Sequence, residues 1–348
     1  MLSPLDNLNY KKVDPSDILT HINNYAEEIY DALTIGKKFA VPSYYIKAKK
    51  VVILGMGGSG ISGEIVKSLL ASSNLVVEVV HDYHVPAYTD SDTLVIACSH
   101  SGDTEEPISG FFEARERNAK MIIITTGGKL KSLAGKFKVP CIDYDYKSVP
   151  RAAYLYSLVF LLTIFSKLGH YKLDNHIIKD VFETLEKSQA KFAPENNEIS
   201  NPAKLLAEKI AGKVVVIYAS SKLVAVAQRF KGQFNENSKN FAFFEEYPEL
   251  NHNAIEGLQN PKNACAIISL ESNFDSDRIN LRQNIISEII NKNHIVYERV
   301  RFVSAQNPLS EMIAMLQFCD YVSFYLAILN KVDPTPMPNI DYLKSRLT

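Results

Sequence analysis

Short, continuous apolar runs alternate with longer amphipathic stretches along this chain, and this alternation constrains its fold more than any other feature. The runs are rich in valine and isoleucine, which is typical of strands buried on both faces of a parallel sheet. Because the pattern occurs twice, we predict an α/β protein with two tandem units, each a parallel β-sheet flanked by helices in three layers. The predicted strands cover residues 51–54, 76–80, 93–98, 121–124 and a short run from Val139, then 213–218, 264–269 and 294–300.

The stretches around these runs are predicted helices, and they suggest the domain limits. An amphipathic pattern precedes the first run, and residues 171–205 indicate a helical connection with polar turns. We therefore expect a first domain over 1–165, a connection over 166–205 and a second domain over 206–348. The apolar stretch 152–166 is shorter than the roughly 20 residues that a membrane span needs, so we interpret it as a buried core helix.

Composition argues against several classes of function. The chain is 46% hydrophobic and 22% charged, and its net charge of −1 does not steer it toward nucleic acid or an anionic membrane. Its cysteines are scattered without a CxxC pair, and its N-terminus lacks an apolar signal core, so we expect free thiols and a cytoplasmic location. The histidines show no metal-ligand spacing, and we expect neither a metal nor another cofactor.

A first candidate anion site is the sequence GMGGSG at residues 55–60, between a predicted strand and a predicted helix. Gly57, Gly58 and Ser59 would let backbone N–H groups approach an anion at the helix start, where the helix dipole is favourable. The segment also matches GxGxxG, with Glu78 or Asp82 near the distance of a dinucleotide-binding acid. A nicotinamide enzyme and a purely structural turn are therefore alternatives at this point.

A second candidate loop, SHSGDTEE at residues 99–106, follows the predicted strand 93–98. Ser99, Ser101 and Thr104 bring three hydroxyls to another helix start, and with Ser59 they form a set of neutral donors suited to a phosphate monoester. A dinucleotide site needs no such second cluster. The alternative is that Ser101 or Thr104 only caps the helix, which explains one hydroxyl but not three.

These two loops resemble the phosphate-contacting loops of sugar-isomerase (SIS) domains, where the second loop commonly has the form SxSGxT. The resemblance implies tandem SIS domains with flavodoxin-like sheets. The family's second loop often has tyrosine and asparagine where this chain has His100 and Asp103. Both changes leave Ser99, Ser101 and Thr104 in place. We expect Asp103 to be a helix-start acid that faces away, and we expect no catalytic role for His100.

Moving a carbonyl between neighbouring carbons of a sugar phosphate requires ring opening, a base and a fixed positive charge beside the enediolate. Arg151 in VPRAA precedes a predicted buried helix, Glu236 lies in FNENSK, and His252 lies in the polar segment ELNHNAIEG. Taken alone, Arg151 could form a surface salt bridge and Glu236 could be a solvated surface residue, so the residues leave these alternatives to a catalytic role open.

Together, these motifs make the chain resemble the bifunctional phosphoglucose/phosphomannose isomerases over nearly its whole length. The resemblance implies that Arg151 stabilises a cis-enediolate, Glu236 transfers the proton, His252 assists ring opening and Lys344 contributes from the C-terminus. It further implies interconversion of glucose 6-phosphate and mannose 6-phosphate with fructose 6-phosphate, and a homodimer with shared active sites.

Two rival functions remain open. One is a glucose-6-phosphate isomerase without mannose activity, since a family threonine linked to this choice has only a weak candidate here in Thr335, with Met337 competing for the position. The other is a sugar-phosphate-sensing SIS module, which would need the loops but not the catalytic residues, and would usually carry an effector domain.

Overall fold

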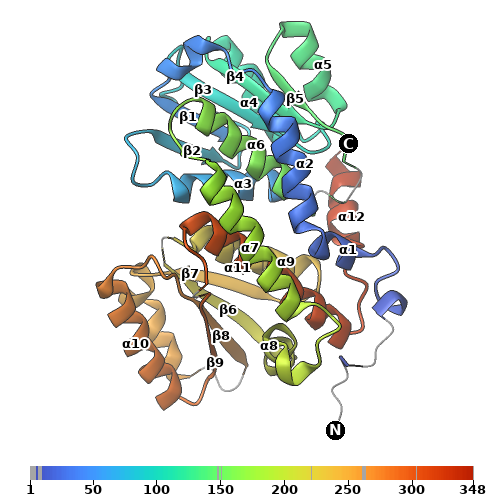
Figure 1. The fold of residues 1–348 in the computed structure, drawn as a ribbon, viewed down its shortest axis with the longest axis vertical. Coiled ribbons are helices and arrows are strands. Elements are labelled where there is room, and N and C mark those ends of the chain that lie inside the picture. The colour runs from blue at the N-terminus through green and yellow to red at the C-terminus, as the bar shows by residue number, and fades with distance from the viewer. Residues whose placement is uncertain are drawn as a thin grey trace. The chain divides into compact units, whose positions relative to one another are not determined.

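The chain forms two compact units in its computed structural model, an N-terminal unit of Tyr25–Ile178 and a C-terminal unit of Met1–Asn24 with Lys179–Thr348. The structure describes residues 5–6, 10–146, 149, 151–220, 222–260, 264–302 and 304–347. Each unit contains its own parallel sheet with helices packed on it (Figure 1). The predicted α/β fold with two parallel sheets is therefore confirmed.

The sheet of the N-terminal unit has the strand order β2-β1-β3-β4-β5, and every neighbouring pair is parallel. In register, Leu54 at the end of β1 lies beside Val80 of β2 and Ala97 of β3. Strand β2 lies on one side of β1 and β3 lies on the other, so the strand order reverses at β1. In sheets of this kind, ligands bind at such a switch point, beyond the carboxyl ends of the strands. The strands are β1 (Lys50–Leu54), β2 (Val76–Val80), β3 (Thr93–Cys98), β4 (Lys120–Thr125) and β5 (Cys141–Asp143).

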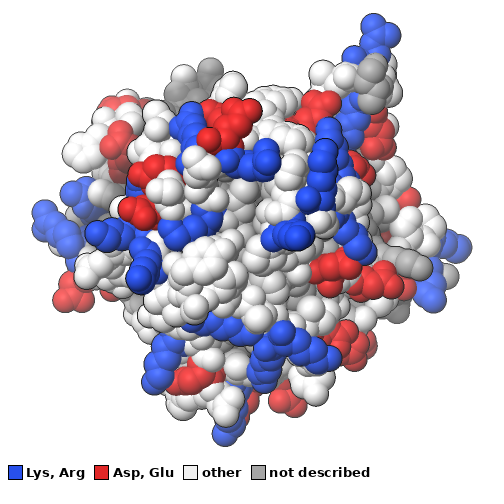
Figure 2. Space-filling model, turned by 90° about the horizontal axis from the view of Figure 1, so that it is seen from above, with Lys and Arg blue, Asp and Glu red and all other residues white. Residues whose placement is uncertain are grey.

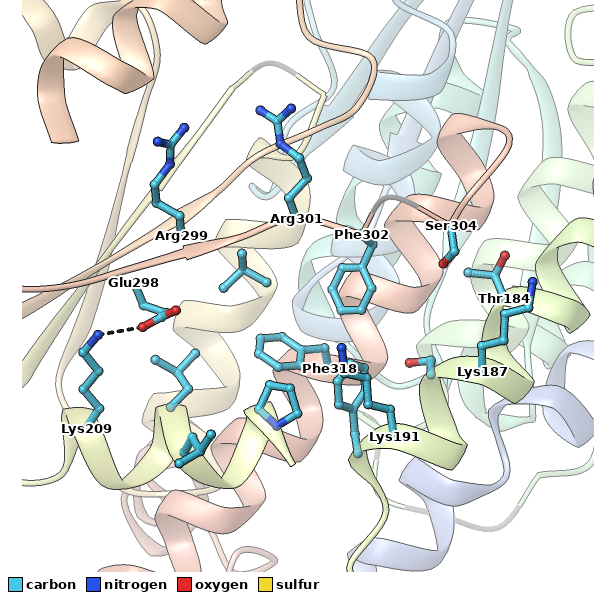
Figure 3. A pocket seen from close by; sticks show the side chains of 16 residues that line it. Thr184, Lys187, Lys191, Lys209, Glu298, Arg299, Arg301, Phe302, Ser304 and Phe318 are labelled. Carbon is cyan, nitrogen blue, oxygen red and sulfur yellow. Dashed lines mark hydrogen bonds and ion pairs between the residues drawn. The ribbon is translucent and has the colours of Figure 1, made fainter. Parts of the chain in front are cut away.

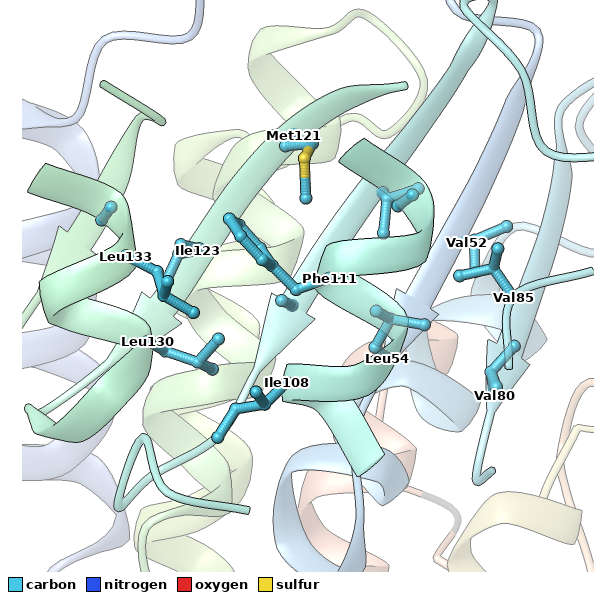
Figure 4. Close-up of a cluster of buried hydrophobic side chains, with 14 residues drawn as sticks. Val52, Leu54, Val80, Val85, Ile108, Phe111, Met121, Ile123, Leu130 and Leu133 are labelled. Atoms are coloured by element: carbon cyan, nitrogen blue, oxygen red, sulfur yellow. The ribbon is translucent and has the colours of Figure 1, made fainter. Parts of the chain in front are cut away.

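Helices α4 and α5 cover one face of this sheet and bury a continuous apolar core (Figure 4). Phe111 of α4 is fully buried and lies with Ile123, Leu130 and Leu133. Burying each such side chain contributes roughly 1.5–3 kcal/mol, which fixes the ends of β1 and β3 as rigid platforms for their loops. The helices of this unit are α2 (Tyr25–Lys38), α3 (Gly57–Leu69), α4 (Glu105–Glu116), α5 (Gly128–Phe137) and α6 (Tyr154–Lys167), with a 3₁₀ helix, η2, at Ser43–Lys47.

The C-terminal sheet has the order β7-β6-β8-β9, which repeats the arrangement of the first four strands of the other sheet. The edge strand β7 was not predicted as a strand, because its apolar run 241–244 gives way at once to Glu245 and Glu246, and only Ala242 of the strand is fully buried. Phe243 within it is 51% exposed, and Phe241 just before it is 74% exposed. The strands are β6 (Val214–Ala219), β7 (Ala242–Glu246), β8 (Cys265–Leu270) and β9 (Val296–Val300).

Helix α11 forms the centre of the C-terminal unit and packs against α8 and α9. It is the one helix of the described residues long and apolar enough to cross a membrane, yet 94% of its apolar window is buried inside the protein. A buried ion pair, Arg229 with Asp320 at 3.0 Å, joins α9 to α11. The helices are α1 (Ile18–Asn23), α7 (Asn175–Phe192, which begins in the N-terminal unit), α8 (Pro202–Ile210), α9 (Val224–Glu236), α10 (Asp277–Lys292), α11 (Pro308–Leu329) and α12 (Pro338–Leu347), with 3₁₀ helices η1 (Tyr10–Lys12), η3 (Glu198–Ser200), η4 (Glu249–His252) and η5 (Ala254–Gln259).

Three helix predictions need correction. Helix α3 begins at Gly57, within the GMGGSG segment that was predicted to precede it, because the glycines of this segment form its first turn. Helix α5 was not predicted, since it starts with a glycine and is rich in lysine. The predicted connection 171–205 breaks into α7 and α8, where Asn201 caps a helix that starts at Pro202.

Candidate active site

The first loop presents uncapped backbone amides at the start of α3. Met56 occupies the N-cap position, but no side chain caps this helix. The first helix hydrogen bond is donated by Gly60 to the Met56 carbonyl at 3.1 Å, so the amides of Gly57, Gly58 and Ser59 have no acceptor within the helix. These three N–H groups at the positive end of the helix dipole form a ready site for an anion.

Close packing fixes the path of this loop. A Cβ added to Gly60 would lie 2.5 Å from the Gly55 carbonyl oxygen, so only glycine fits there. The ring of His81, just after β2, contacts the same carbonyl through Nδ1 at 2.8 Å and Glu64 of α3 through Nε2 at 3.2 Å. The hydrogen bond to Glu64 raises the pKa of His81, although partial burial opposes the shift. His81 was not predicted from the sequence, where it is an isolated histidine after a strand.

The second loop brings two of its predicted hydroxyls together. The oxygens of Ser99 and Thr104 lie 2.8 Å apart, and the Gly102 amide donates to Ser99 at 3.1 Å. Thr104 occupies the N-cap position of α4, but its side chain makes no capping hydrogen bond, which speaks against the simple capping interpretation. Ser101 is exposed and accepts from the Asp103 amide at 3.2 Å.

A third loop, residues 125–128 between β4 and α5, supports the second and was not predicted. Gly102 has a positive φ of 76°, and a Cβ there would lie 2.0 Å from the Gly127 carbonyl oxygen. The Asp103 carboxylate accepts from the Lys129 amide at 2.9 Å, so this acid serves the start of α5 and not, as expected, the start of the helix that follows its own loop. His100 lies 3.2 Å from the Tyr144 hydroxyl through Nδ1, within an aromatic cluster.

Arg151 lies in a turn just before α6, and it is only 4% exposed. Its burial rules out the alternative of a surface salt bridge. The hydroxyl of Ser62 lies 2.9 Å from the Gly58 carbonyl and 2.8 Å from the Tyr154 carbonyl, which ties the start of α6 to the first turn of α3. This contact places the turn that carries Arg151 beside the first loop. Pro150 of the same motif lies outside the described residues.

Glu236 is the last residue of α9, and its side chain is half-buried. The two residues after it are fully buried: Asn237 donates to Ser323 of α11 at 3.0 Å, and Ser238 donates to the Phe234 carbonyl at 2.7 Å. The end of α9 is therefore held rigidly against α11, and the carboxylate of Glu236 projects from a fixed backbone.

His252 and Lys344 are both exposed. His252 ends the 3₁₀ helix η4, and its neighbour Asn251 accepts from Arg282 at 3.0 Å. Lys344 lies on α12, a helix with no buried residues. Because the structure determines each unit by itself, Glu236, His252 and Lys344 are placed within the C-terminal unit, and the phosphate loops with Arg151 are placed within the N-terminal unit.

The charges around these features belong to a surface of mixed sign. On the face seen in Figure 2, lysine and arginine side chains are interspersed with aspartate and glutamate. Within the residues that the structure describes, no group of three or more His, Cys, Asp or Glu side chains lies together as a metal site would require. Among these described residues, the candidate features for binding an anion are backbone amides, hydroxyls and the buried Arg151.

Comparisons with known proteins show the family of this chain. Residues 44–163 match the SIS domain family, and residues 199–347 match the bacterial phospho-glucose isomerase C-terminal SIS domain. A bifunctional phosphoglucose/phosphomannose isomerase of Caldicellulosiruptor bescii is 39% identical over 94% of this chain and 97% of its own length. Its counterpart in Aquifex aeolicus is 33% identical over 86% of this chain and 90% of its own length.

Among solved structures, the C-terminal domain of glucosamine-fructose-6-phosphate aminotransferase from Francisella tularensis superimposes with a TM-score of 0.71. It covers 96% of this chain and 100% of that domain, and at 14% identity it shows the fold alone. The predicted SIS fold is thereby confirmed. The close sequence relatives go further: this chain belongs to the bifunctional phosphoglucose/phosphomannose isomerase family and is an isomerase.

Proposed function

We propose that this protein interconverts glucose 6-phosphate and mannose 6-phosphate with fructose 6-phosphate. The observation that carries the proposal is the pair of loops in the N-terminal unit, where the first amides of α3 have no acceptor within the helix and the hydroxyls of Ser99 and Thr104 lie together, sharing one hydrogen bond that bonds to a phosphate would replace. The names of the relatives supply the two hexose phosphates.

The phosphate is held at these loops. The amides of Gly57, Gly58 and Ser59 donate to its oxygens at the start of α3, and the hydroxyls of Ser99 and Thr104 donate from the second loop. Ser101 contributes from the rim. Each hydrogen bond from a neutral donor to the anion contributes about 1.5–3 kcal/mol. Because no ion pair is formed, the phosphate can bind to these donors and leave again.

The chemical step requires four further residues. His252 moves a proton during ring opening, and Glu236 then takes the proton from C2 of the open aldose while the carbonyl electrons move to O1. The resulting cis-enediolate is stabilised by the positive charge of Arg151, with Lys344 as a second cation. Glu236 returns the proton to C1 while the hydroxyl proton on O2 moves to O1 and the C2 carbonyl forms, so the step is redox-neutral overall and needs no external acceptor.

The base assignment is tested with Glu236→Gln. General-base catalysis contributes about 10²–10⁴-fold, so we expect kcat for glucose 6-phosphate to fall by that factor while calorimetric binding of fructose 6-phosphate is retained. Glu256→Gln is the matched control, since Glu256 is exposed and bonds only its neighbour Gln259 at 2.8 Å. Isomerase activity that persists in Glu236→Gln with binding unchanged would refute the role.

Dual specificity needs its own experiment. A coupled assay with mannose 6-phosphate, run beside glucose 6-phosphate, is expected to show turnover of both epimers. Absence of mannose 6-phosphate turnover would reduce the function to that of a glucose-6-phosphate isomerase.

We also propose a cytoplasmic homodimer in which His252 acts on the substrate of the partner subunit. Three features support it: His252 is exposed, α12 has no buried residues, and all four cysteines are free. Equal mixing of Glu236→Gln with His252→Ala, followed by subunit exchange, should restore about a quarter of wild-type activity, because half of the dimers then contain one intact site. No recovery in a mixture shown to exchange subunits would contradict the shared site.

A further inference from the structure

A pocket in the C-terminal unit lies outside the residues assigned to isomerisation. It is lined by residues of α7, α8 and α11, by residues 298–302 and by Ser304, and its volume is about 520 Å³. Small-molecule sites in proteins usually measure about 300–1,000 Å³. Glu236, His252 and Lys344 do not line it, so its chemistry must be considered separately.

The floor of this pocket is aromatic. The rings of Phe192, Phe302 and Phe318 surround one another, with centroid separations of 5.0 Å for Phe192 with Phe318 and 5.6 Å for the two pairs that include Phe302. Figure 3 shows the Phe302 ring pointing into the pocket above Phe318. An apolar ligand body would bury its surface on this floor, with edge-to-face contacts if it is a planar ring.

One rim of the pocket is basic and lacks counter-ions. Lys187 and Lys191 are exposed on α7, one turn apart on the same face, and neither forms an ion pair with any residue that the structure describes. On the opposite rim, Lys209 is neutralised by Glu298 at 2.6 Å, drawn as the dashed line in Figure 3. The positive charge available to a ligand therefore comes from α7.

The two arginines of the lining do not compete with these lysines. Arg299 and Arg301 bind Glu271 at 2.6 and 3.3 Å. In Figure 3 they extend to the side of the chain away from the Phe302 ring. The single Glu271 carboxylate balances one of the two guanidinium charges, and both guanidinium groups point away from the Phe302 ring.

A polar group in the pocket wall is also left without a partner. Ser188 lies next to Lys187 on α7 and is only 4% exposed, and within the described part of the chain its hydroxyl has no hydrogen-bond partner. A buried hydroxyl without a partner costs free energy that a ligand acceptor at this wall would recover.

We propose that this pocket binds a small amphipathic anion. Its apolar body lies on the three phenylalanine rings, and its single carboxylate, sulfonate or phosphate head lies between Lys187 and Lys191 near the Ser188 hydroxyl. The site is separate from sugar-phosphate binding, so it stands or fails independently of the proposed function.

The test compares two fluorescent probes with similar apolar bodies, the anion 8-anilinonaphthalene-1-sulfonate and the neutral N-phenyl-1-naphthylamine. In the full-length protein, K187E/K191E is expected to weaken binding of the sulfonate at least about tenfold and to leave the neutral probe unchanged. The matched control is Lys179→Glu, a reversal on the same helix at a residue that pairs with Glu183 and does not line the pocket. Equal sulfonate affinity in K187E/K191E and the wild type would overturn the proposal.

A second variant and a competition series locate the probe and define its body. Phe302→Ser should weaken both probes, and fructose 6-phosphate should displace neither. Displacement of the sulfonate by dodecanoate would assign an aliphatic ligand, and displacement only by 1-naphthyl phosphate would assign an aromatic one. Displacement by fructose 6-phosphate, or by neither amphipathic competitor, would overturn the proposal.

Discussion

The two units have the same arrangement of strands, but the equivalent loops differ in whether the protein supplies its own carboxylate there. In the N-terminal unit, the loops after β1 and β3 offer amides and hydroxyls to an external anion. In the C-terminal unit, β6 and β8 hold the same places in the sheet, and the loop after β8 contains the protein's own acid. Asp275 accepts there from the hydroxyl of Ser220 and from the amide of Ser272, at 3.3 Å in the latter case.

The helix that follows each sheet carries opposite charge at its start. Arg151 is buried just before α6, whereas Glu311 is buried in the first turn of α11 and is 1% exposed. The Glu311 carboxylate accepts from the Asn273 amide at 2.7 Å and from the Ser272 hydroxyl. One fold thus leaves donors without an internal anion in one unit, where we propose the phosphate site, and has them satisfied by internal carboxylates in the other.

The largest difference between the two units is expected when hydroxyls are removed from their equivalent loops, after β3 and after β8. Ser99→Ala/Thr104→Ala removes two hydrogen bonds to the phosphate, each contributing about 1.5–3 kcal/mol, so kcat/KM should fall by about 10²–10⁴. Ser272→Ala in the C-terminal unit should leave kcat/KM within about twofold and lower the free energy of unfolding by about 1–3 kcal/mol, because Glu311 loses a donor. Steady-state kinetics and urea unfolding check both. Similar kinetic losses in the two variants would contradict the comparison.

The C-terminal unit is expected to depend on its buried ion pair. Asp320 binds Arg229 at 3.0 Å and Gln233 at 2.9 Å, and both partners lie on α9, which ends at Glu236. Asp320→Ala leaves the arginine charge buried, so the free energy of unfolding should fall by about 3–5 kcal/mol. Asp320→Asn, which keeps hydrogen bonds but not charge, should lose less in the same urea titration. Equal stability of Asp320→Ala and wild type would show that the pair does not hold α9 in place.

Within the first loop, two glycines should respond differently to alanine. Gly57 has a φ of 48° with open space around its Cβ position, so Gly57→Ala meets only backbone strain of about 1–2 kcal/mol. Gly60→Ala would place a methyl group 2.5 Å from the Gly55 carbonyl and must move the loop. We expect a larger rise in KM for Gly60→Ala, measured with glucose 6-phosphate. The reverse order would show that Gly57 controls the shape of the loop.

The smallest effect concerns pH. Burial raises the pKa of Glu311, although hydrogen bonds from Asn273 and Ser272 oppose the shift. A carboxyl with a raised pKa in the folded state stabilises the fold most when protonated, and this stability is lost as pH rises through the folded pKa. Compared with Glu311→Gln, which cannot titrate, wild type should lose unfolding free energy as pH rises through the raised pKa of Glu311. Parallel pH profiles of the two proteins would contradict the shift.

The sequence predicted those parts of the fold whose signal is local. Continuous apolar runs located β1, β2 and β3, and the glycines and hydroxyls at 55–60 and 99–104 located both loops. The edge strand β7 was missed because its apolar run gives way at once to Glu245 and Glu246, and α5 was missed because its sequence is polar.

Contacts between distant residues could not be predicted from the sequence. The bond between Asn237 and Ser323 joins residues 86 positions apart, and no local pattern at Glu236 indicates it. His81 contacts the Gly55 carbonyl and Gly127 packs against Gly102. Each pair is distant in sequence and comes together only in the folded chain. Arg151 illustrates the same limit, since its sequence allowed both a surface and a buried position and only packing decided between them.

The most direct measurement is a crystal structure of Glu236→Gln with fructose 6-phosphate. We expect the phosphate to lie at the start of α3, within hydrogen-bonding distance of the Gly58 and Ser59 amides and of the Ser99 hydroxyl, with no sugar phosphate beside Ser272. A phosphate bound at the loop after β8, or absent from the loops after β1 and β3, would contradict the assignment of opposite roles to the two units.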